Sequence, residues 1–227
     1  TSVGKEMVPL GISGLNSPGR YMAEIRLRKN TEYFSIKLDT LWDLVETDPI
    51  FGTRFLSFTL GRATELLWAT REVNTPVQNK ESESSQGLTY SIDRNIASRV
   101  RDTGFFSSLS TDRLQQILNF SNVLLFSRNQ QITIEGENSK GIMILLSGRL
   151  LISFNNSRNN IHRVQNRTIV RPGMVLSWHN GFSKLPSPYT VVASRDTSIL
   201  LFSANNLKTL SKEEPQLFST LMQRQLW

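Results

Sequence analysis

The stretch Gly141-Ile-Met-Ile-Leu-Leu-Ser-Gly-Arg-Leu-Leu-Ile-Ser153 decides the fold, because two short apolar runs flank the dipeptide Ser147-Gly148. Each run has the length of a buried strand and falls short of a typical helix. Glycine supplies the backbone angles that a tight reversal needs, so Ser147-Gly148 is typical of a turn. The stretch therefore predicts a strand, a turn and a second strand.

Further short apolar runs surround this centre on both sides. The strands that we expect cover residues 123–126, 132–134, 142–146, 150–154, 161–170 and 189–193. Residues rich in Asn, Ser, Gly and Pro separate them at 138–139, 147–148, 155–160 and 172–173. Strands at such spacing, with turn residues between them, predict a sandwich or a barrel.

Helices are expected on both sides of these strands. Ser110, Thr111 and Asp112 are residues that cap a helix N-terminus, and Leu114, Ile117 and Leu118 form an apolar stripe after them. Another helical segment follows the strand at 196–202. This part of the chain thus reads as helix, β-roll and helices.

An internal repeat organises the chain, and such a repeat is decisive for architecture. Residues 30–36 with Leu41, Leu44 and Pro49 match residues 196–202 with Leu207, Leu210 and Pro215, at a constant offset of 166 positions. In both copies a polar turn leads to a short apolar strand, then to a helix, then to an acidic residue followed by Pro. The Pro suits the first turn of a further helix.

The first copy is incomplete in this sequence. It offers a strand at 21–27, the repeated strand at 32–36 and helical segments from about residue 40 to residue 72, so most of its β-roll is absent. Residues 74–87 are polar and linker-like. We therefore expect a partial first unit at 1–72, a linker at 73–89 and a complete second unit at 90–227, mainly β with flanking α.

Composition narrows the function classes. The 227 residues include no cysteine, which excludes disulfides, thiolate nucleophiles and cysteine-ligated metals. No apolar stretch is long enough to span a bilayer, and residues 1–10 lack a signal pattern. We expect an intracellular protein, most simply cytoplasmic, whose targeting segment is missing from this sequence.

Positive charge is concentrated after residue 72. The net charge is +7, whereas basic and acidic residues balance up to residue 72. Much of the excess comes from Arg149, Arg158, Arg163, Arg167 and Arg171. They predict either a solvated sheet surface or a basic face for an acidic partner. Aromatic residues do not alternate with them as in single-strand nucleic-acid sites, so no nucleic acid is expected.

The segment 141–153 resembles the strand-turn-strand centre of the cyclic-nucleotide-binding domain superfamily. Residues 105–114 are similar to the entry helices of that superfamily, and residues 190–193 with 200–202 are similar to its closing strands. The resemblance covers residues 101–227 fully and 4–72 in part. It implies tandem jelly-roll type β-rolls. A weaker similarity to Popeye-type domains rests on the Leu-Leu-Ser-Gly centre and on the helices at Pro49 and Pro215.

The resemblance also implies a place for a ligand, cAMP or cGMP. Superfamily members hold the cyclic phosphate with an Arg and with backbone amides at a helix N-terminus, and a Gly-Glu pair supplies the acceptor for the ribose hydroxyl. In the second unit the Gly-Glu position is Gly173-Met174, and the Arg position is Ser187, before Tyr189 and Thr190. Both charged residues are missing, so nucleotide binding is not expected in the second unit.

The first unit keeps residues that fit this cassette better. Gly4, Glu6 and Arg20 follow the order glycine, acid and arginine, and Arg20 precedes the strand predicted at 21–27. The repeat offset places the superfamily's Arg at Tyr21, one position away. Residues 4–21 are therefore the candidate nucleotide site of the chain, if either unit has one.

Enzyme motifs are absent from the sequence. His162 and His179 have no second histidine at metal-ligand spacing, and neither a nucleophile elbow nor a phosphate-binding loop occurs. We expect no catalytic or metal-binding residues and no cofactor beyond a cyclic nucleotide.

Three functions stay open at this point. The first is a regulatory or scaffolding module that contacts a protein partner or the remainder of a larger chain. The second is a cyclic-nucleotide sensor of a kinase, channel or transporter. The third is a catabolite-activator-type transcription regulator that lacks its DNA-binding part, since no recognition helix follows the β-roll here.

Overall fold

The computed structural model describes residues 32–69, 87–90, 94–138, 140–158, 161–176 and 186–223, together with Gly11, Leu15, Glu24 and Arg26. The helices are α1 (Leu38–Thr47), α2 (Pro49–Ala69), α3 (Arg94–Asp102), α4 (Thr111–Leu118), α5 (Ala204–Glu213) and α6 (Pro215–Gln223). The strands are β1 (Leu88–Tyr90), β2 (Asn122–Phe126), β3 (Gln131–Thr133), β4 (Gly141–Ser147), β5 (Leu150–Arg158), β6 (Ile161–Ile169), β7 (Val175–Leu176), β8 (Thr190–Ala193) and β9 (Thr197–Ser203).

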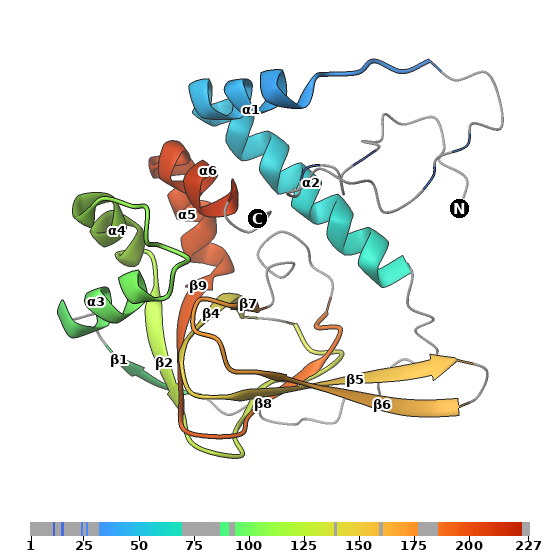
Figure 1. The fold of residues 1–227 in the computed structure, drawn as a ribbon, viewed down its shortest axis with the longest axis vertical. Coiled ribbons are helices and arrows are strands. Elements are labelled where there is room, and N and C mark those ends of the chain that lie inside the picture. The colour runs from blue at the N-terminus through green and yellow to red at the C-terminus, as the bar shows by residue number, and fades with distance from the viewer. Residues whose placement is uncertain are drawn as a thin grey trace.

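The strands form two antiparallel sheets, as Figure 1 shows. One sheet has the order β1-β2-β9-β4-β7 and the other has the order β3-β8-β5-β6. Strand β9 lies in the middle of the first sheet, where Leu200 pairs with Val123 of β2 and with Ile144 of β4. The predicted fold class, mainly β with flanking helices in a β-roll, is confirmed.

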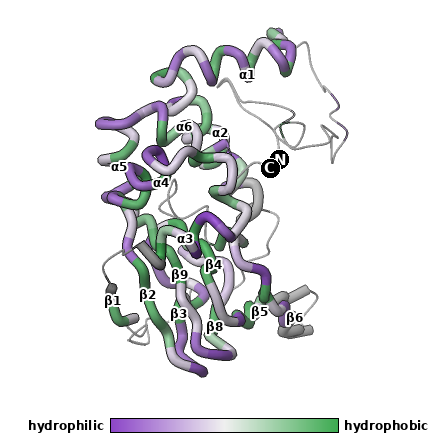
Figure 2. The backbone as a smooth tube through the Cα atoms, turned by 60° about the vertical axis from the view of Figure 1, so that its left-hand side comes forward, coloured by the Kyte–Doolittle hydropathy of each residue, from purple (hydrophilic) through white to green (hydrophobic). Residues whose placement is uncertain are grey.

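Strand β4 explains why residues 141–153 decide this fold. Side chains of successive strand residues point to opposite faces of a sheet, and here both faces are covered. Ile142, Ile144 and Leu146 belong to one buried cluster, whereas Met143 and Leu145 belong to another. A continuous apolar run is what a strand buried on both faces needs. Figure 2 shows this hydrophobic character along β2, β4 and β9.

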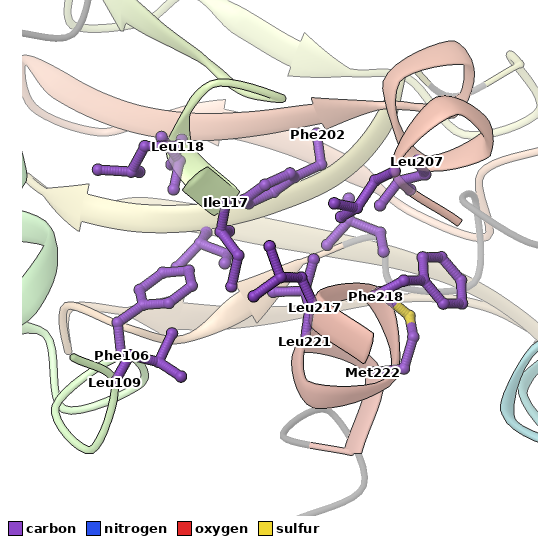
Figure 3. Packing of buried hydrophobic residues seen from close by; sticks show 14 of the residues in the cluster. Phe106, Leu109, Ile117, Leu118, Phe202, Leu207, Leu217, Phe218, Leu221 and Met222 are labelled. Atoms are coloured by element: carbon purple, nitrogen blue, oxygen red, sulfur yellow. The ribbon is translucent and has the colours of Figure 1, made fainter. Parts of the chain in front are cut away.

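The first buried cluster joins the helices to the outer face of the five-stranded sheet (Figure 3). Phe202 of β9 lies beside Ile117 of α4, and α6 contributes Leu217, Phe218, Leu221 and Met222. The second cluster lies between the two sheets and includes Ile132, Leu150, Val191 and Ile199. The β-roll is thus packed inside and covered by helices on one side.

Helix α4 begins where its sequence predicted. The Ser110 hydroxyl accepts a hydrogen bond from the Arg113 backbone N–H at 3.3 Å, which satisfies one of the free donors of the first turn. Leu114, Ile117 and Leu118 are all buried. The predicted cap and stripe are therefore confirmed.

The turn after β4 is fastened by a neighbouring helix. The Arg99 guanidinium of α3 donates to the hydroxyls of Ser147 and Ser198, at 2.8 and 2.9 Å. Gly148 has φ +103°, and a Cβ atom there would lie 2.6 Å from the Asp196 carbonyl oxygen. The Ser147-Gly148 turn thus needs its glycine for backbone angle and for space.

The helices of the repeat correspond closely. Adding 166 to the bounds of α1 gives those of α5, and adding 166 to Pro49 gives Pro215, the first residue of α6. Their caps differ, because the Ser203 hydroxyl caps α5 whereas Lys37 makes no side-chain cap on α1. This correspondence supports a repeat of helices.

The strand predicted for residues 32–36 is wrong, because residues 32–37 have no regular secondary structure. Their counterpart, β9, pairs with strands on both sides, whereas no strand in the described part of the chain pairs with 32–37. Tyr33 and Phe34 are 75% and 76% exposed. A single segment without ladder partners has no reason to become a strand. Of the residues in the strand predicted at 21–27, the structure describes only Glu24 and Arg26, which have no regular secondary structure.

Three short elements were not predicted from the sequence. Strand β1 uses the last two residues of the predicted linker and pairs with β2, β7 pairs with β4, and α3 precedes the predicted entry helix. The turn predicted at 155–160 is narrower, because β5 continues to Arg158 and β6 begins at Ile161.

Candidate ligand-binding site

The candidate site of the second unit lies where β7 and β8 join the roll. Gly173 occupies the turn before β7, and its N–H donates to the Leu145 carbonyl at 2.8 Å. Its φ is +87°, and a Cβ atom there would lie 2.3 Å from the Thr103 carbonyl oxygen. Gly173 therefore lets the segment after α3 pack against the roll, a structural task that needs no ligand.

Met174 stands where the resemblance implies a glutamate. Its backbone is tied to β4, since the Leu145 N–H donates to the Met174 carbonyl at 3.0 Å. The side chain is 41% exposed. A thioether is a weak acceptor and has no charge, so Met174 does not replace a carboxylate as partner of a ribose hydroxyl.

Ser187 stands where the resemblance implies the phosphate-binding arginine, and it is fully buried. Its hydroxyl donates to the Tyr189 carbonyl at 2.8 Å. Its backbone N–H donates to the Glu137 carbonyl at 2.7 Å, and its own carbonyl accepts from the Gly136 N–H at 2.8 Å. Ser187 thus fastens the start of β8 to the turn between β3 and β4.

Tyr189 and Thr190 also serve the roll itself. The Thr190 hydroxyl accepts a hydrogen bond from the Glu135 N–H at 3.1 Å, which is a further contact between β8 and the same turn. The Tyr189 ring meets the Phe154 ring edge-on at 5.6 Å, and the Arg167 guanidinium lies 5.9 Å from the Phe154 ring centre. This cation therefore lies over an aromatic ring.

The structure brings Ser187, Tyr189 and Thr190 together at one turn and ties Gly173 and Met174 to β4. Sequence patterns did not reveal the role of the turn at Glu135, Gly136 and Glu137, because its contacts with 187–190 run through backbone atoms. They also did not reveal the aromatic pair of Phe154 and Tyr189. No local signal joins those two residues.

The other candidates lie outside the described residues or are only partly described. Gly4, Glu6, Arg20 and Tyr21 belong to the first group, as does His179. Of the basic residues, Arg167 and Arg171 are exposed and Arg149 is half-buried. The side chains of Arg158, Arg163 and His162 are not described.

Neither a candidate metal site nor a candidate membrane span occurs within the described ranges. No group of three or more His, Asp or Glu side chains there could hold a metal ion. Among the helices of those ranges, none has the length and apolar character to cross a bilayer.

Comparisons by sequence find nothing: no protein-family model matches the chain, and no curated protein is significantly similar to it. Comparison of structures does find neighbours. A cyclic nucleotide-binding domain from Methylobacillus flagellatus matches with 15% identity and a TM-score of 0.55, over 61% of this chain and 79% of that one. The chain therefore has the fold of a cyclic-nucleotide-binding domain.

Two further neighbours are more distant. The N-terminal domain of a transcriptional regulator from Streptomyces coelicolor A3(2) has 14% identity and a TM-score of 0.47, over 56% of this chain and 86% of that one. Thermus thermophilus catabolite activator protein has 16% identity and a TM-score of 0.44, over 52% of this chain and 54% of that one. The similarity to Popeye-type domains stays a prediction.

Proposed function

We propose that this chain, whose β-roll has the cyclic-nucleotide-binding fold, is a non-catalytic regulatory or scaffolding module of a larger protein or complex. In this proposal the roll has kept its core and lost its ligand. The module acts through contacts with protein, either a partner or the remainder of a longer polypeptide.

The observation that carries the proposal is the burial and hydrogen bonding of Ser187. Its side chain is fully buried, and its hydroxyl and both backbone polar groups already have partners within the roll. Ser187 itself offers a phosphate no positive charge, unlike the arginine that the resemblance implies at this position. Hydrogen bonds to charged groups contribute on the order of 1.5–3 kcal/mol each, so the loss of Arg and Glu removes a large part of nucleotide affinity.

Exposed apolar side chains at residues 33–44 support protein contacts instead. They are the side chains of Tyr33, Phe34, Ile36, Leu38 and Leu44, which are between 40% and 76% exposed and are called the apolar face below. Large apolar side chains that cluster on a surface are typical of interaction sites. Four of them correspond in the repeat to residues that are fully buried, Tyr33 to Ile199, Phe34 to Leu200, Ile36 to Phe202 and Leu44 to Leu210.

The repeat also indicates what kind of contact the face makes. In the second unit, β9 buries the corresponding residues by pairing with β2 and β4 on its two edges. Residues 32–37 present the same apolar spacing, and no strand among the described residues pairs with them. A polypeptide that adds strands along them would gain main-chain hydrogen bonds and bury the apolar face.

Isothermal titration calorimetry with cAMP and with cGMP tests the proposal. We expect no binding at micromolar or lower nucleotide concentration. Sub-micromolar binding would overturn the proposal in favour of a cyclic-nucleotide sensor. In that case a Glu6→Gln, Arg20→Ala variant locates the site, since lost binding assigns it to residues 4–21, and Arg26→Ala, an exposed arginine paired with Glu24, is the control.

A further inference from the structure

The contact between α2 and α6 joins equivalent positions of the two repeats. The Thr53 and Ser219 hydroxyl oxygens lie 3.4 Å apart, and these residues are 166 positions apart in the chain. That separation equals the repeat offset. The Thr53 hydroxyl also lies 3.3 Å from the Pro215 carbonyl, to which it donates. Each helix thus presents the same position of its own repeat to the other.

The surfaces around this contact also correspond. Helix α6 buries Leu217, Phe218, Leu221 and Met222, and the corresponding α2 residues are Phe51, Gly52, Phe55 and Leu56. Gly52 and Leu56 are buried, and Phe51 and Phe55 pack against the same cluster. The same face of each helix is therefore turned towards the other.

Contacts between equivalent positions are the mark of a two-fold interface. In such an interface one surface patch meets a second copy of itself, as in symmetric dimers. Here both copies of the patch belong to one polypeptide. A covalent link gives the internal partner a high effective concentration, which favours it over any second molecule.

One position breaks the symmetry. Phe218 stands beside Ser219 on α6, whereas Gly52 stands beside Thr53 on α2. A Cβ atom at Gly52 would lie 2.6 Å from the Val45 carbonyl oxygen and 3.0 Å from the Ser219 hydroxyl oxygen. The close approach of α1 to α2 therefore requires a glycine at this position, and a Cβ atom there would also crowd the Ser219 hydroxyl of α6. In a pair of α6 helices with the same geometry, Phe218 of the second copy would take the place of Gly52 beside Ser219, where a close-packed interface does not tolerate so large a side chain.

We propose that the α6 face is one half of an internal two-fold-like interface whose specific partner is α2 of the same chain. The glycine at 52 selects α2 over a second α6. Both helices of this interface belong to one chain. Helix α6 is therefore not available for pairing with another molecule. This inference does not depend on whether either unit binds a nucleotide.

Cysteine cross-linking tests this directly, because the chain has no cysteine of its own. The Thr53→Cys, Ser219→Cys variant is expected to form a disulfide within one chain on oxidation and to keep the mass of 25.8 kDa. Each single variant is expected to stay uncross-linked. The matched control is Arg54→Cys, Thr220→Cys, one position further along each helix, where the more exposed side chains should give no cross-link.

Two results would overturn the proposal. One is a covalent dimer of the Ser219→Cys single variant, which would show that α6 pairs with α6 of a second molecule. The other is a product of twice the mass from the double variant, which would show exchange between chains. Light scattering of the unaltered protein adds a measurement free of any folding defect, and a dimer that Ser219→Arg dissociates would contradict the proposal as well.

Discussion

At position 173 the chain needs a residue without a side chain for two independent reasons. The backbone has φ +87°, a conformation that L-residues with a Cβ rarely adopt, and the Thr103 carbonyl occupies the place of that Cβ. In the superfamily that the sequence resembles, a glycine at this position belongs to the ligand cassette. Here its contacts with α3 and β4 are reason enough for it.

Replacing Gly173 by Ala therefore combines backbone strain with a collision. Gly104→Ala is the matched control, because Gly104 has φ +77° and a Cβ atom there would have no neighbour within 4 Å. We expect Gly173→Ala to lower the free energy of unfolding by about 1–3 kcal/mol more than Gly104→Ala does. Urea denaturation of both variants measures this. Equal losses would mean that the contact with Thr103 relaxes at no cost.

Helices α1 and α5 have matching sequence patterns but different surroundings. Leu210 of α5 is fully buried beneath α6, whereas Leu44, its counterpart on α1, is 40% exposed. The pattern of leucines predicted both helices correctly. It could not show that Leu210 is covered in the core and that Leu44 is not.

Alanine variants of Leu44 and Leu210 test this difference in burial. Leu210→Ala leaves a cavity in the core and should cost about 2–5 kcal/mol of unfolding free energy. Leu44→Ala removes a side chain that is partly in water and should cost less than about 1 kcal/mol. Thermal and urea unfolding compare the two. A loss at Leu44 equal to that at Leu210 would contradict an exposed apolar face on the chain.

The sequence predicted the elements of the roll because each is marked locally. Strand β4 is a continuous apolar run, and α4 has a serine cap. The three-residue strand β1 and the two-residue strand β7 are too short for such a signal, and pairing with β2 and β4 alone creates them. The segment 32–36 is the converse case, because the local pattern is present and the described part of the chain offers it no strand partner.

At the candidate site, the sequence predicted only that the acid and the arginine of the superfamily are missing. Met174 and Ser187 in place of an acid and an arginine follow from the sequence once the resemblance is recognised. The hydrogen bonds of Ser187 with the turn before β4 could not be predicted from the sequence. Their partners, Gly136 and Glu137, lie about 50 residues away and bind through backbone atoms. Backbone contacts of this kind leave no trace in residue type.

At the scale of the described molecule, helices from its N-terminal and C-terminal parts share one core with the five-stranded sheet. Leu56 and Leu60 of α2 belong to the cluster that contains Phe202 of β9 and Phe218 of α6. Figure 1 shows α2 crossing beside α6 above the roll. Helix α2 is thus packed onto the β-roll, while the apolar side chains at residues 33–44 that are named above remain exposed.

The protein's own hydrogen bonds tie Ser187, where the resemblance places the ligand cassette, to the turn at Gly136 and Glu137. Hydrogen–deuterium exchange at the amides of Gly136 and Ser187 tests this most directly, because both amides donate within the fastening. We predict that they exchange slowly in the free protein, as protected core amides do, and that cAMP in large molar excess leaves their rates unchanged. Rapid exchange in the free protein that cAMP slows would show an open, ligand-ordered cassette and would contradict a closed one.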